Sequence, residues 1–230
     1  IDIYERYVQI QTKSSIDAKT IKVLNPKEVV FEGGRELELD AVSEVPRYYV
    51  CNAYGVCGIY SAPGTAVKEA YDTSGIVTND RGVTVWLKGN RVSRNQIMAI
   101  KEESVTEQKN SLAVCLDNIL RHAGITRNTE YDLAQGKTAT TILSENMTGV
   151  QVLDLSGCTL DAVLYYVNQD IPVLAILEDG EAVLVTGFNE FNVVIMEPAT
   201  GKLYKKGMND ATAWFAENGN HFITYMRIEN

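Results

Sequence analysis

Hydrophobic positions repeat with helical spacing in several segments, and the strongest of them is 111–124. Its apolar residues lie on one face of a helix that Gly124 ends. Thr159 is placed to cap a second helix, because apolar positions at helical spacing follow it through 160–167. Weaker helical patterns cover 61–75 and 210–217. Four helices are therefore expected from this periodicity.

Short runs dense in β-forming residues surround the helix predicted over 61–75. Ser61 is the predicted N-cap of this helix, Pro63 suits its first turn, and Gly75 closes it. The predicted strands before and after it give a ββαββ unit. These strands are predicted at 48–51, 56–60, 76–78 and 83–87.

The sequence predicts three regions along the chain. Residues 1–45 are an N-terminal arm or partial domain with β-like runs at 21–24 and 29–31, and residues 46–100 form the small α+β module. A charged stretch at 101–110 is the predicted boundary, so the second domain covers 105–230. In that domain helices precede strands at 173–177, 181–198 and 222–226. Such an arrangement predicts an α+β fold with an antiparallel sheet.

Composition excludes several functions. The chain has 230 residues and a formal net charge of −9, so it lacks the basic surface that phosphate binding needs, and nucleic acid is not an expected partner. It has no apolar run of the roughly 20 residues that cross a bilayer. With two histidines and no CxxC pair, neither a metal site nor a cofactor is expected.

Four cysteines are too few for a disulfide scaffold of this size. Cys51 and Cys57 flank a short turn segment and face each other across a predicted hairpin. A disulfide between them remains open, but two half-buried free thiols are the favoured interpretation.

The hairpin over 181–198 opens with Glu181, closes with Glu197 before Pro198, and has apolar strands on both sides of a polar turn. Together with the segment LYYVNQDIPVL at 164–174, it gives residues 108–230 a resemblance to the papain-like domain of bacteriocin-processing cysteine peptidases. The resemblance implies a papain-like fold in a bacterial protein that is exported or displayed on the cell surface. The spacing of 16 residues between the two glutamates suits the family's spacing from His to Asp.

The catalytic positions depart from that family. Its catalytic Cys, His and Asp or Asn correspond to Ser111, Glu181 and Glu197 here, and these three positions are called the catalytic slots below. The oxyanion-hole Gln would be Gln108, three residues before the nucleophile slot instead of about six. A thiol at a helix N-terminus beside an imidazolium becomes a thiolate, whereas a serine hydroxyl needs a general base. A carboxylate with an ordinary pKa of about 4.3 is a weak base for that purpose.

Ordinary structural roles compete with each assignment. Asn110 or Ser111 suits a helix N-cap, and both glutamates suit solvated strand ends. Cys115 lies on the apolar helix face and is expected to be an inert buried thiol. His221 approaching Cys115 or Cys158 from another strand would instead give an active cysteine peptidase with a displaced nucleophile.

The favoured function is a non-catalytic papain-like binding or interaction module; the alternatives are that displaced peptidase and a structural spacer. A tyrosine-rich acidic cleft suits a peptide, glycan or protein ligand. The sequence does not determine the oligomeric state. The residues predicted to bind are Gln108, Ser111, Glu181, Phe188 and Glu197.

Overall fold

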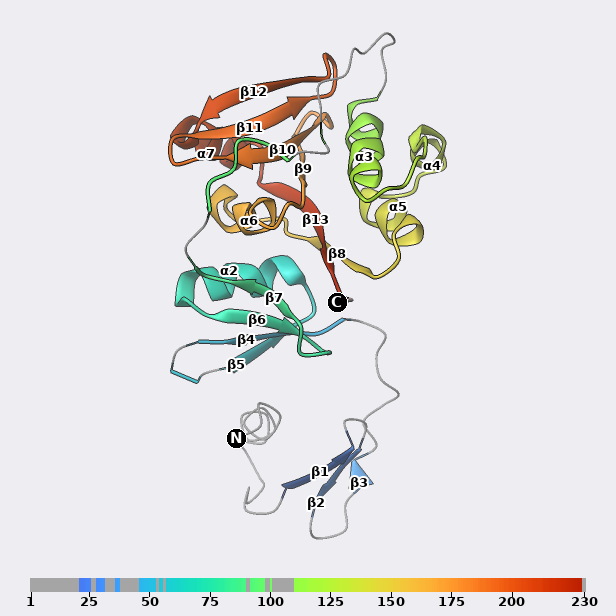
Figure 1. The fold of residues 1–230 in the computed structure, drawn as a ribbon. Coiled ribbons are helices and arrows are strands. Elements are labelled where there is room, and N and C mark those ends of the chain that lie inside the picture. The colour runs from blue at the N-terminus through green and yellow to red at the C-terminus, as the bar shows by residue number, and fades with distance from the viewer. Residues whose placement is uncertain are drawn as a thin grey trace.

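The structure is a computed structural model (Figure 1). It describes the side chains of residues 46–52, 54–55, 57–89, 92–97, 100 and 110–228, and in the first 45 residues the backbone of three strands. Those strands form an antiparallel sheet in the order β1-β2-β3. Their bounds are β1 Ile21–Asn25, β2 Glu28–Phe31 and β3 Glu36–Leu37.

The next unit is the predicted ββαββ module, and the structure confirms its order. Its antiparallel sheet has the strand order β5-β4-β6-β7, and α2 packs against this sheet. The elements are β4 Tyr48–Cys51, β5 Cys57–Tyr60, α2 Pro63–Thr73, β6 Ile76–Asn79 and β7 Thr84–Leu87. The N-cap is Ala62 instead of Ser61, with Pro63 opening the helix, and left-handed Ser74 is the C-cap.

The second unit begins with three helices and a strand, at α3 Ser111–His122, α4 Glu130–Ala134, α5 Ala139–Asn146 and β8 Val150–Asp154. It continues through α6 Leu160–Val167, β9 Val173–Ile176, β10 Ala182–Phe188, β11 Asn192–Glu197, β12 Lys202–Gly207, α7 Met208–Glu217 and β13 His221–Arg227. The strands form one six-stranded antiparallel sheet in the order β12-β11-β10-β9-β13-β8. The α+β class predicted from the sequence is confirmed.

Helices cover both faces of this sheet. All seven residues of β10 are buried, which requires apolar cover on each face of a strand whose side chains alternate. Figure 1 shows α3 on one side of the sheet and α6 with α7 on the other, and both α3 and α6 contact β10. The start of α3 therefore lies next to the central strands.

Side-chain caps fix the starts of the two strongest helices. The Asn110 side-chain oxygen accepts hydrogen bonds from the backbone N–H groups of Leu112 and Ala113, at 2.9 and 3.2 Å. Thr159 caps α6 through Ala162 N–H, as predicted. Asn110 is thus the N-cap of α3, which leaves the Ser111 side chain available for another contact.

The two units meet along a surface that we call the seam, where α2 and β7 approach α6 and β8. One continuous buried core runs through both units. Backbones approach closely there, since a Cβ placed on Gly64 would lie 2.9 Å from the Ser156 carbonyl oxygen. Since residues 101–109 lie outside the described residues, the predicted domain boundary stays a prediction.

The segment before that stretch also pairs with the sheet. Arg94 and Phe188 exchange backbone hydrogen bonds of 2.7 and 2.9 Å in an antiparallel bridge. Nearby, a Cβ on Gly187 would lie 2.6 Å from the Asn95 carbonyl oxygen, so only glycine permits this approach. Residues 92–97, called the linker below, therefore pair with the end of β10, where Phe188 is buried.

Cys51 and Cys57 form a disulfide, which corrects the expectation of two free thiols. They are opposite residues in the β4–β5 ladder, with Cα atoms 4.2 Å apart. The turn between them brings the two strands into this register, so the thiols face each other. Within the part of the chain that the structure describes, no helix is long and apolar enough to cross a membrane.

Candidate functional site

The start of α3 meets the start of β10 through Ser111. The backbone N–H of Ala182 donates to Ser111 Oγ at 3.0 Å. Ser111 is 9 % exposed, whereas Glu181, the next residue before this contact, is exposed. Two of the three catalytic slots are therefore neighbours in space although 70 residues separate them in sequence.

Glu197 lies on the adjoining strand. Leu184 pairs with Met196 near the start of β10, and Glu197 is the next residue and the last of β11, where it pairs with Lys202 of β12. Glu197 is exposed and accepts a hydrogen bond from Thr200 Oγ1 at 2.7 Å. The arrangement therefore has two solvated carboxylates and a hydroxyl at the catalytic slots, with neither a thiol nor an imidazole.

Cys115 lies one helical turn beyond Ser111 and is fully buried. Burial raises the pKa of its thiol well above the ordinary value, and the negative charge of Glu181 raises it further. Both effects oppose thiolate formation, which is the reverse of what a cysteine nucleophile requires. Cys115 is therefore protonated and packed in the core at neutral pH.

Cys158 is part of the seam. Its thiol donates to the Gly64 carbonyl oxygen at 3.3 Å. This hydrogen bond connects the residues just before α6 to α2. Burial raises the pKa of Cys158 to about 12. This thiol is a packing residue and a weak hydrogen-bond donor, and it is not a nucleophile at neutral pH.

Neither histidine completes a catalytic pair in the described structure. The His221 imidazole folds over Gly219, where a Cβ would lie 2.7 Å from Nε2, and no hydrogen bond joins it to a described cysteine. His122 is at the C-terminal end of α3, about 16 Å along the axis from Ser111. The structure therefore does not bring the predicted fallback pair of Cys115 and His221 together by a hydrogen bond.

His122 belongs to a separate buried network. Its Nδ1 is 3.0 Å from the Tyr225 hydroxyl, and its Nε2 is 3.9 Å from Asp170 Oδ2, while Arg94 pairs with the other oxygen, Oδ1, at 3.3 Å. Desolvation lowers the pKa of His122 although Asp170 opposes that effect, and Arg227 lowers it further. Burial raises the pKa of Tyr225 to about 12. This network joins α3 to β13 and holds a neutral imidazole at neutral pH.

The other residues predicted to bind a ligand have different positions. Phe188 is 4 % exposed at the far end of β10 from Glu181, where it pairs with the linker, so it does not line the catalytic slots. Gln108 lies outside the described residues. The part of the chain that the structure describes also holds no group of acidic, histidine or cysteine residues arranged to bind a metal ion.

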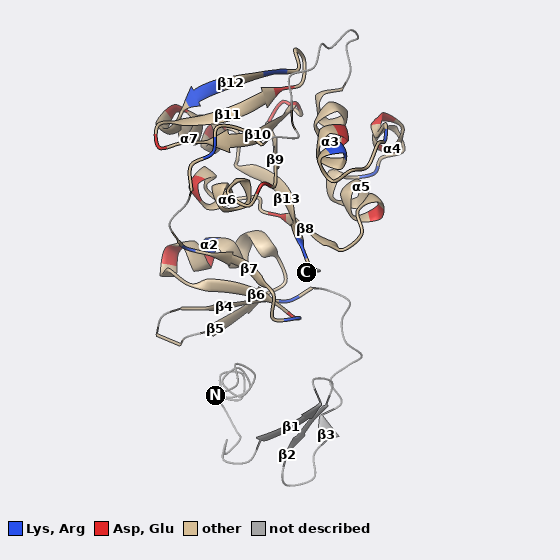
Figure 2. Cartoon of the chain, in the orientation of Figure 1, with Lys and Arg blue, Asp and Glu red and all other residues tan. Residues whose placement is uncertain are grey.

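Charge is unevenly distributed over the molecule. Figure 2 shows blue, the colour of Lys and Arg, along β12, the edge strand of the large sheet, and Lys202 and Lys205 of this strand are exposed. Lysines on an edge strand discourage pairing with another chain. Exposed carboxylates gather in the turn from Glu178 to Glu181, whereas Glu197 lies opposite the exposed Lys202 in the β11–β12 ladder.

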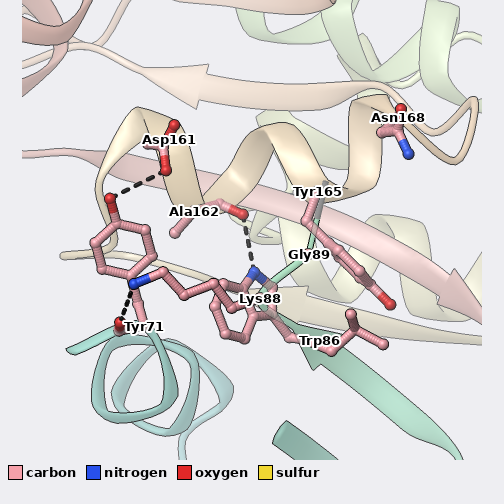
Figure 3. Close-up of a pocket in the computed structure, with 9 residues that line it drawn as sticks. Tyr71, Trp86, Lys88, Gly89, Asp161, Ala162, Tyr165 and Asn168 are labelled. Atoms are coloured by element: carbon pink, nitrogen blue, oxygen red, sulfur yellow. Dashed lines mark hydrogen bonds between the residues drawn. The ribbon is translucent and has the colours of Figure 1, made fainter. Parts of the chain in front are cut away.

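A pocket that the sequence did not predict lies on the seam. It has a volume of about 180 Å³ and receives side chains from α2, the end of β7, and α6 (Figure 3). Several of its residues are aromatic, and the tyrosine-rich composition was the one sequence signal for it. Its lining consists of Tyr71, Trp86, Leu87, Lys88, Gly89, Asp161, Ala162, Tyr165 and Asn168.

Part of this chain is similar in fold to a protein of solved structure. No family model and no curated protein matches this chain. A protein from Bacillus anthracis described as a C39-like peptidase is structurally similar, with a TM-score of 0.49 and 13 % sequence identity. The similarity covers 59 % of this chain and 98 % of that protein.

Proposed function

We propose that residues 110–228 are a papain-like module that binds a peptide segment and does not cleave it. The observation that carries this proposal is the hydrogen bond from Ala182 N–H to Ser111 Oγ. This hydrogen bond supports the proposal that the nucleophile slot, Ser111, and the histidine slot, Glu181, lie side by side. They hold a serine and a carboxylate in place of a cysteine and a histidine. A serine without an imidazole lacks the general base that acyl transfer requires.

The two buried thiols support the same conclusion. A cysteine peptidase needs a thiolate near neutral pH, yet Cys115 and Cys158 both have raised pKa values. Glu181 and Glu197 are both exposed at the positions where peptidases of the similar family hold His and Asp, and Lys202 lies opposite Glu197 in the β11–β12 ladder. The exposed carboxylates of Glu178, Asp179 and Glu181 suit a basic peptide segment, which they attract without chemical reaction.

The proposed setting is outside the cytoplasm of a bacterium, at the cell surface. The Cys51–Cys57 disulfide supports this location, because disulfides persist in oxidising compartments and are rare in the cytosol. The resemblance to exported bacterial proteins supports it as well.

A synthetic peptide library tests binding and cleavage in one experiment. Peptides rich in lysine and arginine should be retained by the immobilised protein, remain intact by mass spectrometry, and be lost from an E181Q/E197Q variant. The matched control is E130Q/E217Q, which removes two glutamates exposed elsewhere on the surface. Cleavage that disappears in C115A would show a peptidase, and equal retention by all three proteins would exclude this binding surface.

A further inference from the structure

The seam pocket is separate from the catalytic slots, and hydrogen bonds between its walls fix its shape. On one wall, Trp86 Nε1–H donates to the Ala162 carbonyl oxygen at 3.0 Å. On another, the Tyr71 hydroxyl donates to Asp161 Oδ2 at 3.0 Å. These bonds connect β7 and α2 to α6, so the pocket walls are fixed before any ligand arrives (Figure 3).

Aromatic rings form one side of the pocket. Trp86 lies between Tyr71 and Tyr165, with ring centroids 6.1 Å from each, at tilted angles. Trp86 is only 2 % exposed, so it supports the two half-buried tyrosines more than it meets solvent. Lys88 lies over the Tyr71 ring and Asp161 accepts from the Tyr71 hydroxyl, so Tyr165 is the ring that a ligand can pack against.

One positively charged and one negatively charged side chain lie beside these rings. Lys88 is exposed; its Nζ lies 5.0 Å from the Tyr71 ring centroid and 3.3 Å from the Tyr71 carbonyl oxygen. Asp161 lies on the facing helix, with one oxygen accepting from Tyr71. One cation and one anion on the same small pocket leave its formal charge at zero, which disfavours a ligand with a net charge of either sign.

Asn168 adds a donor. Its side-chain oxygen accepts from Val92 N–H at 2.8 Å, which fixes the orientation of the amide. Its amide nitrogen is a hydrogen-bond donor on a residue that lines the pocket. The pocket therefore combines donors from Lys88 and Asn168 with the acceptor Asp161 beside aromatic rings.

We propose that the seam pocket binds one neutral sugar ring. A pyranose has hydroxyl groups that both donate and accept, and an apolar face that packs on an aromatic ring. The volume of about 180 Å³ is below the usual 300–1,000 Å³ of sites for drug-sized ligands and suits a single ring. A ligand of about 12 non-hydrogen atoms binds with a Kd in the millimolar range at ordinary ligand efficiency.

Nuclear magnetic resonance of the tryptophan indole groups tests the proposal on the whole chain. The methyl glycosides of glucose, galactose, mannose and N-acetylglucosamine are titrated while the Trp86 indole N–H signal is followed; a W214F variant assigns it, because the chain has two tryptophans. At least one glycoside should shift the Trp86 signal saturably. Lys88→Gln should weaken that binding at least about fivefold, as expected for one lost charge-assisted hydrogen bond.

Lys205→Gln is the matched control, because it removes an exposed lysine from β12 and should leave the Kd unchanged. An unshifted Trp86 signal with all four glycosides would overturn the proposal, as would equal weakening by both variants. Saturable binding of glycine or alanine, with none of the sugars, would also overturn it, because the lysine and aspartate would then recognise a zwitterion. None of these results depends on the catalytic slots, so the glycoside titration and the peptide-binding experiment test two independent proposals.

Discussion

The catalytic slots and the seam use similar polar side chains, but they organise them differently. At the slots, Ser111 contacts a backbone N–H while Glu181 and Glu197 extend into solvent. At the seam, Trp86 and Tyr71 each donate one directed hydrogen bond to the facing helix α6. Buried, fully paired polar groups fix a geometry, whereas exposed carboxylates only set a local charge.

The difference indicates where specificity in this chain resides. The slots hold a serine and two exposed carboxylates, while the seam holds a pocket between α2, β7 and α6. The molecule is therefore better understood as two potential binding surfaces on one shared core than as a damaged enzyme. Variants that add chemistry to the slots, or remove bonds from the seam, test this comparison.

The largest expected effect comes from rebuilding the catalytic pair. In an S111C/E181H variant, a thiol at the helix N-terminus would lie beside an imidazole, and both favour the thiolate. Its iodoacetamide reaction rate at pH 6 should exceed that of S111C alone on the order of 100-fold. S111C/E178H is the control, because it places a histidine in the neighbouring turn. Equal rates in the two double variants would mean that the slots do not converge.

Removing the disulfide should destabilise the small module. A C51S/C57S variant lacks a link that closes a short loop, and its free energy of unfolding should fall by about 2 kcal/mol. Urea denaturation measures this loss, and a reductant should produce the same shift in the unchanged protein. A reductant-insensitive urea midpoint would instead indicate that both thiols are free, as the sequence first favoured.

A single buried hydroxyl tests the seam. The Tyr166 hydroxyl donates to the Val85 carbonyl oxygen at 3.1 Å, and the side chain is fully buried. Y166F should lower the free energy of unfolding by about 1–2 kcal/mol because it leaves a buried carbonyl without this partner. Y54F, on a side chain that is 91 % exposed, should have no measurable effect. Similar losses in both variants would show that this bond does not stabilise the seam.

The smallest effect concerns pH. Because the pKa of His122 is lowered in the folded state, the unfolded chain binds more protons below about pH 6.5. The stability due to His122 is therefore present above that pH and is lost as the pH falls through the lowered pKa. Urea unfolding between pH 7.5 and 5 should show a shallower decline in H122N than in H221N. Parallel pH profiles for the two variants would show that His122 is not the group whose protonation lowers the stability.

The sequence predicted long elements well and short ones poorly. The apolar face of α3 and the hairpin of β10 and β11 have enough residues to show a period, and the structure contains both. The helix α4 has only five residues, and α5 has eight residues of which three are buried, whereas the equally long α6 buries six. The edge strand β12 reads KLYKKG, which does not alternate apolar with polar residues, and no strand was predicted there. Periodicity therefore failed where elements were short or on the edge.

The sequence placed Ser111 and Glu181 in one region, and Ser111 does contact the residue after Glu181, whereas no sequence pattern predicted the seam pocket. The slots depend on residues near element ends, whose spacing is visible in one chain. The pocket depends on β7 meeting α6, a contact between residues about 75 apart that no local pattern specifies. The position of Phe188 was also unpredictable, because the linker that pairs with it is distant in sequence.

Site-resolved iodoacetamide labelling of the folded protein near pH 6 tests the central claim most directly. An ordinary thiol is almost wholly protonated at that pH and reacts slowly, whereas an activated one reacts fast. Cys115 and Cys158 should label slowly until denaturation exposes them, as expected for buried thiols of raised pKa. Rapid labelling of either cysteine in the folded protein would contradict the claim that this papain-like module lacks a competent nucleophile.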